Sequence, residues 1–558
     1  MRLGTQPSRL KGSQCQQHMI LRRAGATAHG AHRCKAAPRA PAVRVAAVAT
    51  RHSPSATEPA ARQERPPAQA SQPLADSDQT FSFEQQWWPC AVLATFDKAR
   101  PHALELLGRQ LALWYDAPAA TWRACEDACP HRLAPLSEGR VDAGNGQIEC
   151  AYHGWRFEGG SGACVRIPQA TDDARACARC RVRTYPTREA AGLLFVWATP
   201  DDDARAAAAP LPLTQAIQDH VASGGQITWY RRLLPYGWDV LLENLADPSH
   251  LPFSHHGLAG LRRDKALPMP FTPLAIPDPG GPAGGPLASE FPASGGRPPC
   301  VLPHAQPVAL FRYPTVSGES ALALVAVSAP CSVSYYSRLS AITLSAELMA
   351  VPAGPGRSMA FTGNIIQIRP QANPLMRLLF RLAPKPPSWK NCLTYNQLFD
   401  QDSPFLAAQD AALRKLGGGR AWAKAYYMPV TCDRLIVALR GWVDKAGGGP
   451  AYPASADPPA PRPARRQVND RWAQHTRECT ACRAAAEGFR RRAALLAGAA
   501  LAAAAAAAGA LAGAGARRAA AALPAAVGAA VLLALAAWRA WRMLPKFEYV
   551  EYCAADND

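Results

Sequence analysis

Two cysteines and two histidines between residues 129 and 155 constrain this chain more than any other feature. They stand in CPHRLAPLSEGRVDAGNGQIECAYHGW as Cys129-Pro-His131 and Cys150-Ala-Tyr-His153. A structural zinc finger usually takes two like ligands from each tight turn. Here each turn supplies one thiolate and one imidazole, which suits two thiolates on one iron and two imidazoles on a second iron. The pattern predicts a 2Fe-2S cluster held between two loops, with a zinc site as the alternative.

Short β-type segments surround these two loops. Between residues 81 and 200, runs such as QLALWYD and CRVRTYP are separated by Gly, Pro and Asp turns, which is typical of a small β domain. An Ala/Asp-rich stretch near 202–210 follows, and a mixed domain is expected from 224 to 445. Its Gly/Pro-rich segment 277–299 is predicted to be a surface insertion with no core function. At 558 residues, two or more domains are expected.

A second metal site is expected in ENLADPSHLPFSHHG, residues 243–257. On one continuous helix His250 and His255 would lie about 140° apart. Pro252 predicts a break between them, so both imidazoles could reach one ion. Non-haem iron that activates oxygen takes two histidines and one carboxylate and keeps positions open. The segment therefore predicts a mononuclear iron site that needs a carboxylate from elsewhere.

The candidate carboxylates lie in NQLFDQDSPFLAAQD, residues 396–410. Asp400 or Asp402 could be the ligand, although either could instead be a charge at the start of a helix. Two further residues are expected near the iron. Asp247 lies one helical turn before His250, and Asn244 lies on the same helical side.

The formal charge of +19 is concentrated at the N-terminus. Residues 1–57 hold ten Lys or Arg and no Asp or Glu, which leaves +9 for the rest. This composition is typical of an organelle transit peptide. A Pro/Ala/Gln-rich linker follows at 58–80. A disordered arm for nucleic acid is the alternative, but we expect no nucleic-acid partner.

The C-terminal region contains two uncharged Ala/Leu/Gly-rich runs, 493–516 and 519–538, with Pro524 in the second. Each reaches the roughly 20 residues that span a bilayer as a helix. A linker at 446–470 and a segment at 471–492 precede these runs, and a tail at 539–558 follows them. We expect a membrane hairpin of two helices, and a soluble Ala-rich hairpin is the alternative.

Together these motifs resemble the pheophorbide a oxygenase family of chloroplast Rieske oxygenases. The resemblance covers roughly residues 82–480 and the tail, and is carried by CPHRLAPLSEGR, YHGW, RIPQA, ENLADPSHLPFSHH, FDQD and HTRECTAC. It implies an α+β fold. A small β Rieske domain would be followed by a mixed α/β, helix-grip-like domain with mononuclear iron, and then by the helical membrane hairpin. Each chain would carry one Rieske 2Fe-2S cluster and one non-haem Fe(II).

The resemblance also implies roles for individual residues. A D-x-D followed by Gln409 favours Asp402 over Asp400 as the third iron ligand. The aspartate at the position of Asp247 would link a cluster histidine of one subunit to an iron histidine of the next, which implies a head-to-tail homotrimer. Cys479 and Cys482 match the family's C-x-x-C and would form a dithiol reducible by thioredoxin. Two unrelated free thiols are the alternative.

The implied activity is ferredoxin-dependent monooxygenation of a chlorophyll-derived tetrapyrrole by molecular oxygen. The pheophorbide a oxygenase reaction is favoured. The alternatives are a chlorophyllide a oxygenase-type enzyme, a sibling that hydroxylates protochlorophyllide or phyllobilins, and a non-catalytic redox sensor of the chloroplast import translocon. The expected location is the chloroplast, with the hairpin in the inner envelope or thylakoid membrane and the catalytic body facing the stroma.

Overall fold

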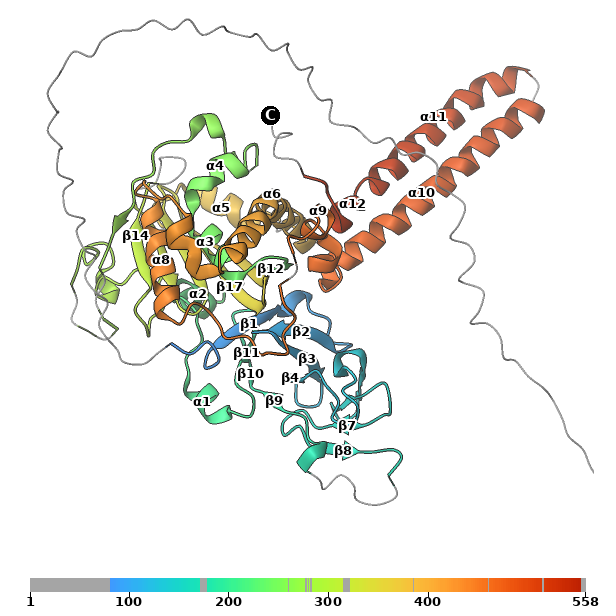
Figure 1. Cartoon of the computed structure of the whole chain (residues 1–558). Coiled ribbons are helices and arrows are strands. Elements are labelled where there is room, and N and C mark those ends of the chain that lie inside the picture. Colours follow the sequence, from blue (N-terminus) through green and yellow to red (C-terminus); the bar gives the residue numbers. More distant parts are fainter. Residues whose placement is uncertain are drawn as a thin grey trace, which may run out of the picture. The chain divides into compact units, whose positions relative to one another are not determined.

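The computed structural model describes residues 81–170, 178–258, 260–275, 278–279, 281, 284–314, 322–384, 386–459, 461–513 and 516–552 (Figure 1). The predicted transit peptide and the linker at 58–80 lie outside these residues. The elements described below all belong to one compact unit, Ser77–Asp558.

Within the described residues, three small antiparallel sheets form the first part of this unit. Their strand orders are β1 (Trp87–Val92), β11 (Leu193–Trp197), β10 (Thr187–Ala190); β2 (His102–Leu106), β3 (Arg109–Asp116), β4 (Thr121–Glu126), β9 (Thr184–Tyr185); and β5 (Arg140–Val141), β6 (Ile148–Glu149), β7 (Arg156–Phe157), β8 (Cys164–Arg166). Trp114 and Trp122 are fully buried, in two separate hydrophobic clusters of this region. The strands are short, so much of this region is loop, and two of its loops carry the predicted cluster ligands.

A larger antiparallel sheet of seven strands follows in the described part of the chain. Its order is β12 (Tyr230–Leu234), β18 (Arg357–Ile368), β17 (Ile342–Gly354), β16 (Ser332–Arg338), β15 (Leu322–Ser328), β14 (Ala309–Arg312) and β13 (Thr272–Pro273). Helix α3 (Trp238–Ala246) packs on β16, β17 and β18, and also contacts α6 (Ser388–Lys415) and α8 (Asp433–Lys445). Because neighbours surround α3, seven of its nine residues are buried.

The remaining short helices connect these layers. They are α1 (Asp203–Ala208), α2 (Gln215–Ala222), α4 (Leu251–Ser254), α5 (Pro374–Leu382), α7 (Trp422–Ala425), α9 (Arg465–Val468) and α12 (Pro545–Glu548). Single turns of 3-10 helix are η1 (Leu93–Thr95), η2 (Leu136–Glu138), η4 (Ala178–Cys180), η5 (Pro248–His250), η6 (Arg263–Lys265), η7 (Pro292–Ser294) and η8 (Gly419–Ala421), whereas η9 (Trp472–Thr476) is a π-helix.

The Gly/Pro-rich segment differs from its prediction as a surface insertion without a core function. Leu287 is fully buried and belongs to a small core with Cys300, Val301 and strands β14 to β16. The Phe291 ring packs edge-on against Tyr336, with 5.6 Å between ring centroids. Leu287 and Phe291 therefore pack this segment against its neighbours, although its composition suggested only a loop. Glycine and proline do not prevent an isolated leucine from being buried.

The C-terminal region returns to the body after two long helices, α10 (Thr480–Gly513) and α11 (Ala516–Trp541), which pack along each other (Figure 1). Phe547 in α12 is fully buried and lies beside Trp389 and Phe489. The Thr476 hydroxyl donates a hydrogen bond to the Phe547 carbonyl, 2.6 Å away. The segments on both sides of the hairpin are thus packed into the protein core.

Two helical stretches, Thr480–Leu511 and Leu523–Glu548, are long and apolar enough to cross a membrane. The first begins earlier than the predicted run at 493, because no proline separates the C-x-x-C segment from that run and α10 continues from Thr480 through both. Leu495, Leu501 and Leu532 are each at least 69% exposed. Such exposed leucines would be well solvated by lipid and poorly by water.

A buried glutamate makes the stability of the large sheet depend on pH. Glu347 on β17 is 1% exposed and accepts hydrogen bonds from the hydroxyls of Thr214 (3.1 Å) and Ser334 (2.6 Å). Burial raises the pKa of Glu347 to about 7, and these bonds only partly oppose it. Since the folded pKa exceeds the ordinary value of 4.5, this group's stabilisation is complete below pH 4.5 and is lost as the pH rises through about 7.

We expect Glu347→Gln to have a higher thermal unfolding midpoint than the unmodified protein at pH 8. The difference should correspond to at most about 3 kcal/mol and should largely vanish at pH 5. Differential scanning calorimetry at the two pH values measures it. The exposed Glu189→Gln serves as a control that should not change the pH profile. Equal effects of Glu347→Gln at both pH values would argue against a carboxyl group that ionises inside the sheet.

Candidate metal centres and active site

The predicted cluster ligands lie on two loops that face each other. Cys129 follows β4, and Cys150 follows β6; both thiols are 1% exposed and belong to a small core with Trp114 and Phe157. Burial and, to a smaller extent, the neighbouring Cys150 raise the pKa of Cys129 to about 12. A positive metal centre would remove this penalty by binding the thiolates.

The two histidines lie at the outer end of the same loops. The rings of His131 and His153 are 4.4 Å apart, and Trp155 stacks on His131 with 4.8 Å between ring centroids. The buried Nδ1 atom of His131 has no hydrogen-bond partner among the described residues. Gly154, with φ of +71°, provides the tight turn between His153 and Trp155. Two sulfurs inside and two imidazoles outside match the donors that a cluster with two unlike irons requires.

The predicted mononuclear site lies at the break between α3 and α4. Asp247 ends α3 and accepts hydrogen bonds from the backbone amide (2.7 Å) and hydroxyl (2.5 Å) of Ser249. Pro248 and Pro252 then stand where a continuous helix would need amide donors. The bend brings the His250 and His255 ring centroids to 5.4 Å, with the rings inclined by 70°.

Asp402 on α6 completes this group. Its Oδ2 atom lies 3.2 Å from His255 Nε2 and 3.6 Å from His250 Nε2, and one ligand atom from each of the three residues lies within 4.8 Å of the others. The buried Oδ1 atom of Asp402 has no hydrogen-bond partner among the described residues. A buried, unpaired carboxylate oxygen beside two imidazoles fits a divalent cation, since burial without a partner is costly.

The surrounding charges and hydrogen bonds also favour a cation. Burial disfavours a charged imidazole, yet Asp402 and Asp247 raise the pKa of His250 to about 10. His255 Nδ1 lies 2.8 Å from Gln401 Oε1, an acceptor, so Nδ1 carries the proton and Nε2 is free to bind metal. The negative potential that would hold a proton on His250 would equally attract Fe(II).

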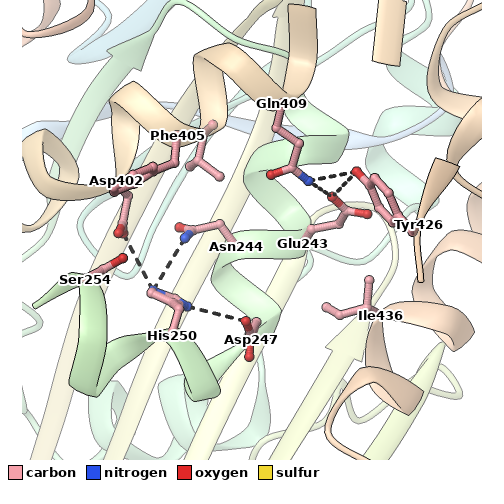
Figure 2. Close-up of a pocket in the computed structure, with 11 residues that line it drawn as sticks. Glu243, Asn244, Asp247, His250, Ser254, Asp402, Phe405, Gln409, Tyr426 and Ile436 are labelled. Carbon is pink, nitrogen blue, oxygen red and sulfur yellow. Dashed lines mark hydrogen bonds and ion pairs between the residues drawn. The ribbon is translucent and has the colours of Figure 1, made fainter. Parts of the chain in front are cut away.

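Asn244 and Asp247 flank His250, as Figure 2 shows. Asn244 Nδ2 is 3.4 Å from His250 Nε2, and Asp247 Oδ2 is 3.7 Å from His250 Nδ1. Burial raises the pKa of Asp247, but His250 and Ser249 outweigh it and lower that pKa below its ordinary range. The Asp247 side chain remains 32% exposed, so its carboxylate is accessible from outside the subunit.

Asp400 occupies a different environment from Asp402. Its two oxygens form buried ion pairs with Arg232 (2.7 Å) and Arg471 (2.6 Å). Arg232 also donates to the backbone carbonyl of Asn396 and to Gln474. This carboxylate is therefore neutralised by two guanidinium groups and joins α6 to the C-terminal segment. His256, for its part, accepts a bond from the Arg263 amide and stays outside the group.

Two cavities open beside His250. One of about 290 Å³ is mainly apolar and is lined by side chains of the large sheet and α6, among them Tyr313, Tyr335, Leu344, Leu348, Leu398 and Phe399.

The other cavity, of about 270 Å³, contains a polar network that the sequence did not reveal (Figure 2). In it Gln409 donates to Glu243 (2.9 Å) and Tyr426 (2.7 Å). Glu243 also forms an ion pair with the buried Arg440. The candidate iron site thus has an apolar side suited to an organic substrate and a polar side suited to ordered water.

Comparisons with known proteins identify the domains and the relatives of this chain. The family model described as Rieske [2Fe-2S] domain matches residues 86–186, and the model described as Pheophorbide a oxygenase matches residues 327–420. Pheophorbide a oxygenase, chloroplastic, of rice is 29% identical over 88% of this chain and 88% of its own length. The enzyme of the same name from Arabidopsis thaliana is 30% identical over 75% of each chain. Flavonoid 8-hydroxylase 2, chloroplastic, of Ocimum basilicum is 30% identical over 72% of this chain and 73% of its own.

Proposed function

Because the chain belongs to the pheophorbide a oxygenase family of Rieske oxygenases, as its motifs predicted, we propose that it is a ferredoxin-dependent monooxygenase of a chlorophyll-derived tetrapyrrole. The observation that carries the proposal is the convergence of His250, His255 and Asp402 at the wall of an apolar cavity. A chain that only sensed redox state through a Rieske cluster would have no need of this second set of ligands.

The residues have the following proposed roles. Cys129, His131, Cys150 and His153 would hold one 2Fe-2S cluster, and His250, His255 and Asp402 would hold one mononuclear Fe(II). Bound there, these groups supply single electrons and the reductive activation of dioxygen. Gln401 keeps the Nδ1 proton of His255 in place, and Asn244 borders the iron position. Two histidines and one carboxylate leave coordination positions open for oxygen.

The apolar cavity supports a largely hydrophobic substrate. Tyrosine, leucine and phenylalanine side chains make up much of its wall and would exclude water from the reacting carbon. The names of the two pheophorbide a oxygenases favour pheophorbide a as the substrate. A flavonoid is the second candidate, because the flavonoid 8-hydroxylase is equally similar in sequence.

We propose the domain division 81–200 for the Rieske domain and 224–445 for the catalytic domain. A linker at 446–470, the C-x-x-C segment at 471–492 and a membrane hairpin at 493–538 would follow. The exposed leucines of the hairpin and the chloroplastic relatives support anchoring in a plastid membrane, with the catalytic body in the stroma. Such a location gives access to pigments that dissolve in membranes.

An oxygen-isotope experiment tests the proposal. The full-length protein, purified in detergent, is supplied with reduced ferredoxin, ¹⁸O₂ and a panel of pheophorbide a, chlorophyllide a, protochlorophyllide and a flavone. We expect about three irons per chain and one ¹⁸O atom in the product of a tetrapyrrole, with no product when ferredoxin is omitted. Product from the flavone alone would favour the second candidate. A chain with a full cluster, no third iron and no product would favour the redox sensor.

A further inference from the structure

A second group of potential metal ligands lies at the start of α10, apart from the iron site. It comprises Cys392 on α6, His475 in the π-helix η9, and Cys479 and Cys482 around the first turn of α10. One ligand atom from each residue lies within 4.8 Å of the other three. The exposed fraction is 4% for Cys392, 6% for His475, 4% for Cys479 and 0% for Cys482. Three thiols and one imidazole therefore converge in a site that is closed to solvent.

The orientation of His475 is the one expected of a metal ligand. Its Nδ1 atom lies 2.7 Å from the backbone carbonyl oxygen of Arg231, which can only accept a hydrogen bond. Nδ1 therefore carries the proton, and Nε2 presents its lone pair to the cysteines, 3.4 Å from Cys482 Sγ. A histidine that binds a metal commonly donates its other N–H to a backbone carbonyl in this way.

The spacing of the ligand atoms fits a single tetrahedral ion. Zinc bonds of about 2.3 Å to sulfur and 2.0 Å to nitrogen place neighbouring ligand atoms roughly 3.5–3.8 Å apart. The observed separations, all within 4.8 Å, need only small side-chain movements to meet this geometry. A two-iron cluster would need its ligands further apart, since they bind different metal atoms. Local π-helical turns are also frequent at functional sites.

The charge around the site suits zinc bound by three thiolates. That assembly carries one net negative charge, which needs a nearby cation when buried. Arg231 lines the same small cavity as Cys392, His475 and Cys479. Glu478 also lines it, but this carboxylate already lies beside Arg100 (3.1 Å) and His102 (2.9 Å). The buried Nε atom of Arg231 has no hydrogen-bond partner among the described residues. Its guanidinium group would offset the charge that zinc leaves on the thiolates.

We propose that Cys392, His475, Cys479 and Cys482 bind one structural Zn²⁺ ion that fastens the start of the C-terminal hairpin to α6. The same helix carries Asp402, ten residues after Cys392, so the ion would hold the hairpin against the helix that completes the iron site. The dithiol predicted from C-x-x-C competes with this proposal. However, thioredoxin attacks accessible sulfur, and Cys479 and Cys482 are almost completely buried.

The test is metal analysis of the full-length protein purified in detergent without added zinc. Inductively coupled plasma mass spectrometry should find about one zinc per chain in addition to iron. In Cys392→Ser, zinc should fall at least about tenfold while the iron content is kept, because zinc sites depend on all four ligands. The control is Cys331→Ser, which changes a fully buried cysteine outside the group and should keep its zinc.

A measurement on the unmodified chain covers the case in which Cys392→Ser does not fold. Zinc K-edge X-ray absorption should show three sulfur and one nitrogen ligands at about 2.3 and 2.0 Å. A shell of oxygen and nitrogen alone would overturn the proposal. So would an iron ion in place of zinc, or a chain without zinc whose Cys479 and Cys482 are recovered as a disulfide. Zinc and iron are counted separately, so failure of this proposal is distinguishable from failure of the oxygenase assignment.

Discussion

Replacing Asp402 with alanine is expected to remove the mononuclear iron while leaving the Rieske cluster intact. Asp402 Oδ2 lies within 3.6 Å of both histidine Nε2 atoms and supplies the only carboxylate of the group of three. Turnover should fall by more than about 100-fold, since even the outer partners of metal ligands are worth about 10–100-fold. Iron per chain should drop from about three to about two, and the electron paramagnetic resonance signal of the reduced cluster should be unchanged.

Asp400→Asn is the matched control, because it changes a carboxylate two residues away on the same helix. It should keep the third iron. The loss of negative charge between Arg232 and Arg471 should instead lower stability by about 3–5 kcal/mol, as expected when one partner of a buried ion pair is removed. The opposite pattern, with iron lost from Asp400→Asn and kept in Asp402→Ala, would contradict the assignment of the third ligand.

The comparison of these two aspartates shows what the sequence alone can predict. The convergence of His250 and His255 was predictable because both histidines and the helix-breaking Pro252 lie within a few residues. The family, the fold class and the oxygenase activity were predictable from the same motifs and are confirmed by the comparisons. Asp400 and Asp402 have nearly the same local context, however, and only the family resemblance favoured Asp402. Arg232 and Arg471, which are distant in sequence, form ion pairs with Asp400, and this distinguishes Asp400 from Asp402.

Long-range packing also explains the site that the sequence did not reveal. Cys479 and Cys482 were visible as a C-x-x-C motif and suggested a dithiol. The other two residues of the proposed zinc site could not be identified from sequence spacing. Cys392 lies more than 80 residues earlier, on a helix whose buried face was unknown. The available signal for a further ligand was His475, which lies four residues before Cys479. A histidine at H-x3-C-x2-C spacing is worth examining as a ligand.

Asp247→Asn is expected to keep both iron centres but to lower turnover by about 100-fold, the upper range for outer partners of a metal ligand. Asparagine retains an Oδ1 acceptor for Ser249, so the turn before His250 should persist. It lacks the charge that orients His250 and that we propose links it to a cluster histidine of the neighbouring subunit. Stopped-flow reduction of the cluster should be normal. The control Asp264→Asn, which changes an exposed carboxylate, should turn over normally.

Co-expression of two inactive chains tests whether electrons pass between subunits. Cys150→Ser lacks the cluster but keeps the iron site, and Asp402→Ala keeps the cluster but lacks the iron. In a mixed head-to-tail ring each iron-bearing chain has an even chance of a cluster-bearing neighbour, so about a quarter of the chains should be active. Transfer within one subunit would give no activity. Adding Asp247→Asn to the Cys150→Ser chain should abolish the recovered activity, because this chain carries the iron that receives the electron and Asp247 acts beside that iron. Adding Asp247→Asn to the Asp402→Ala chain should leave the recovered activity unchanged.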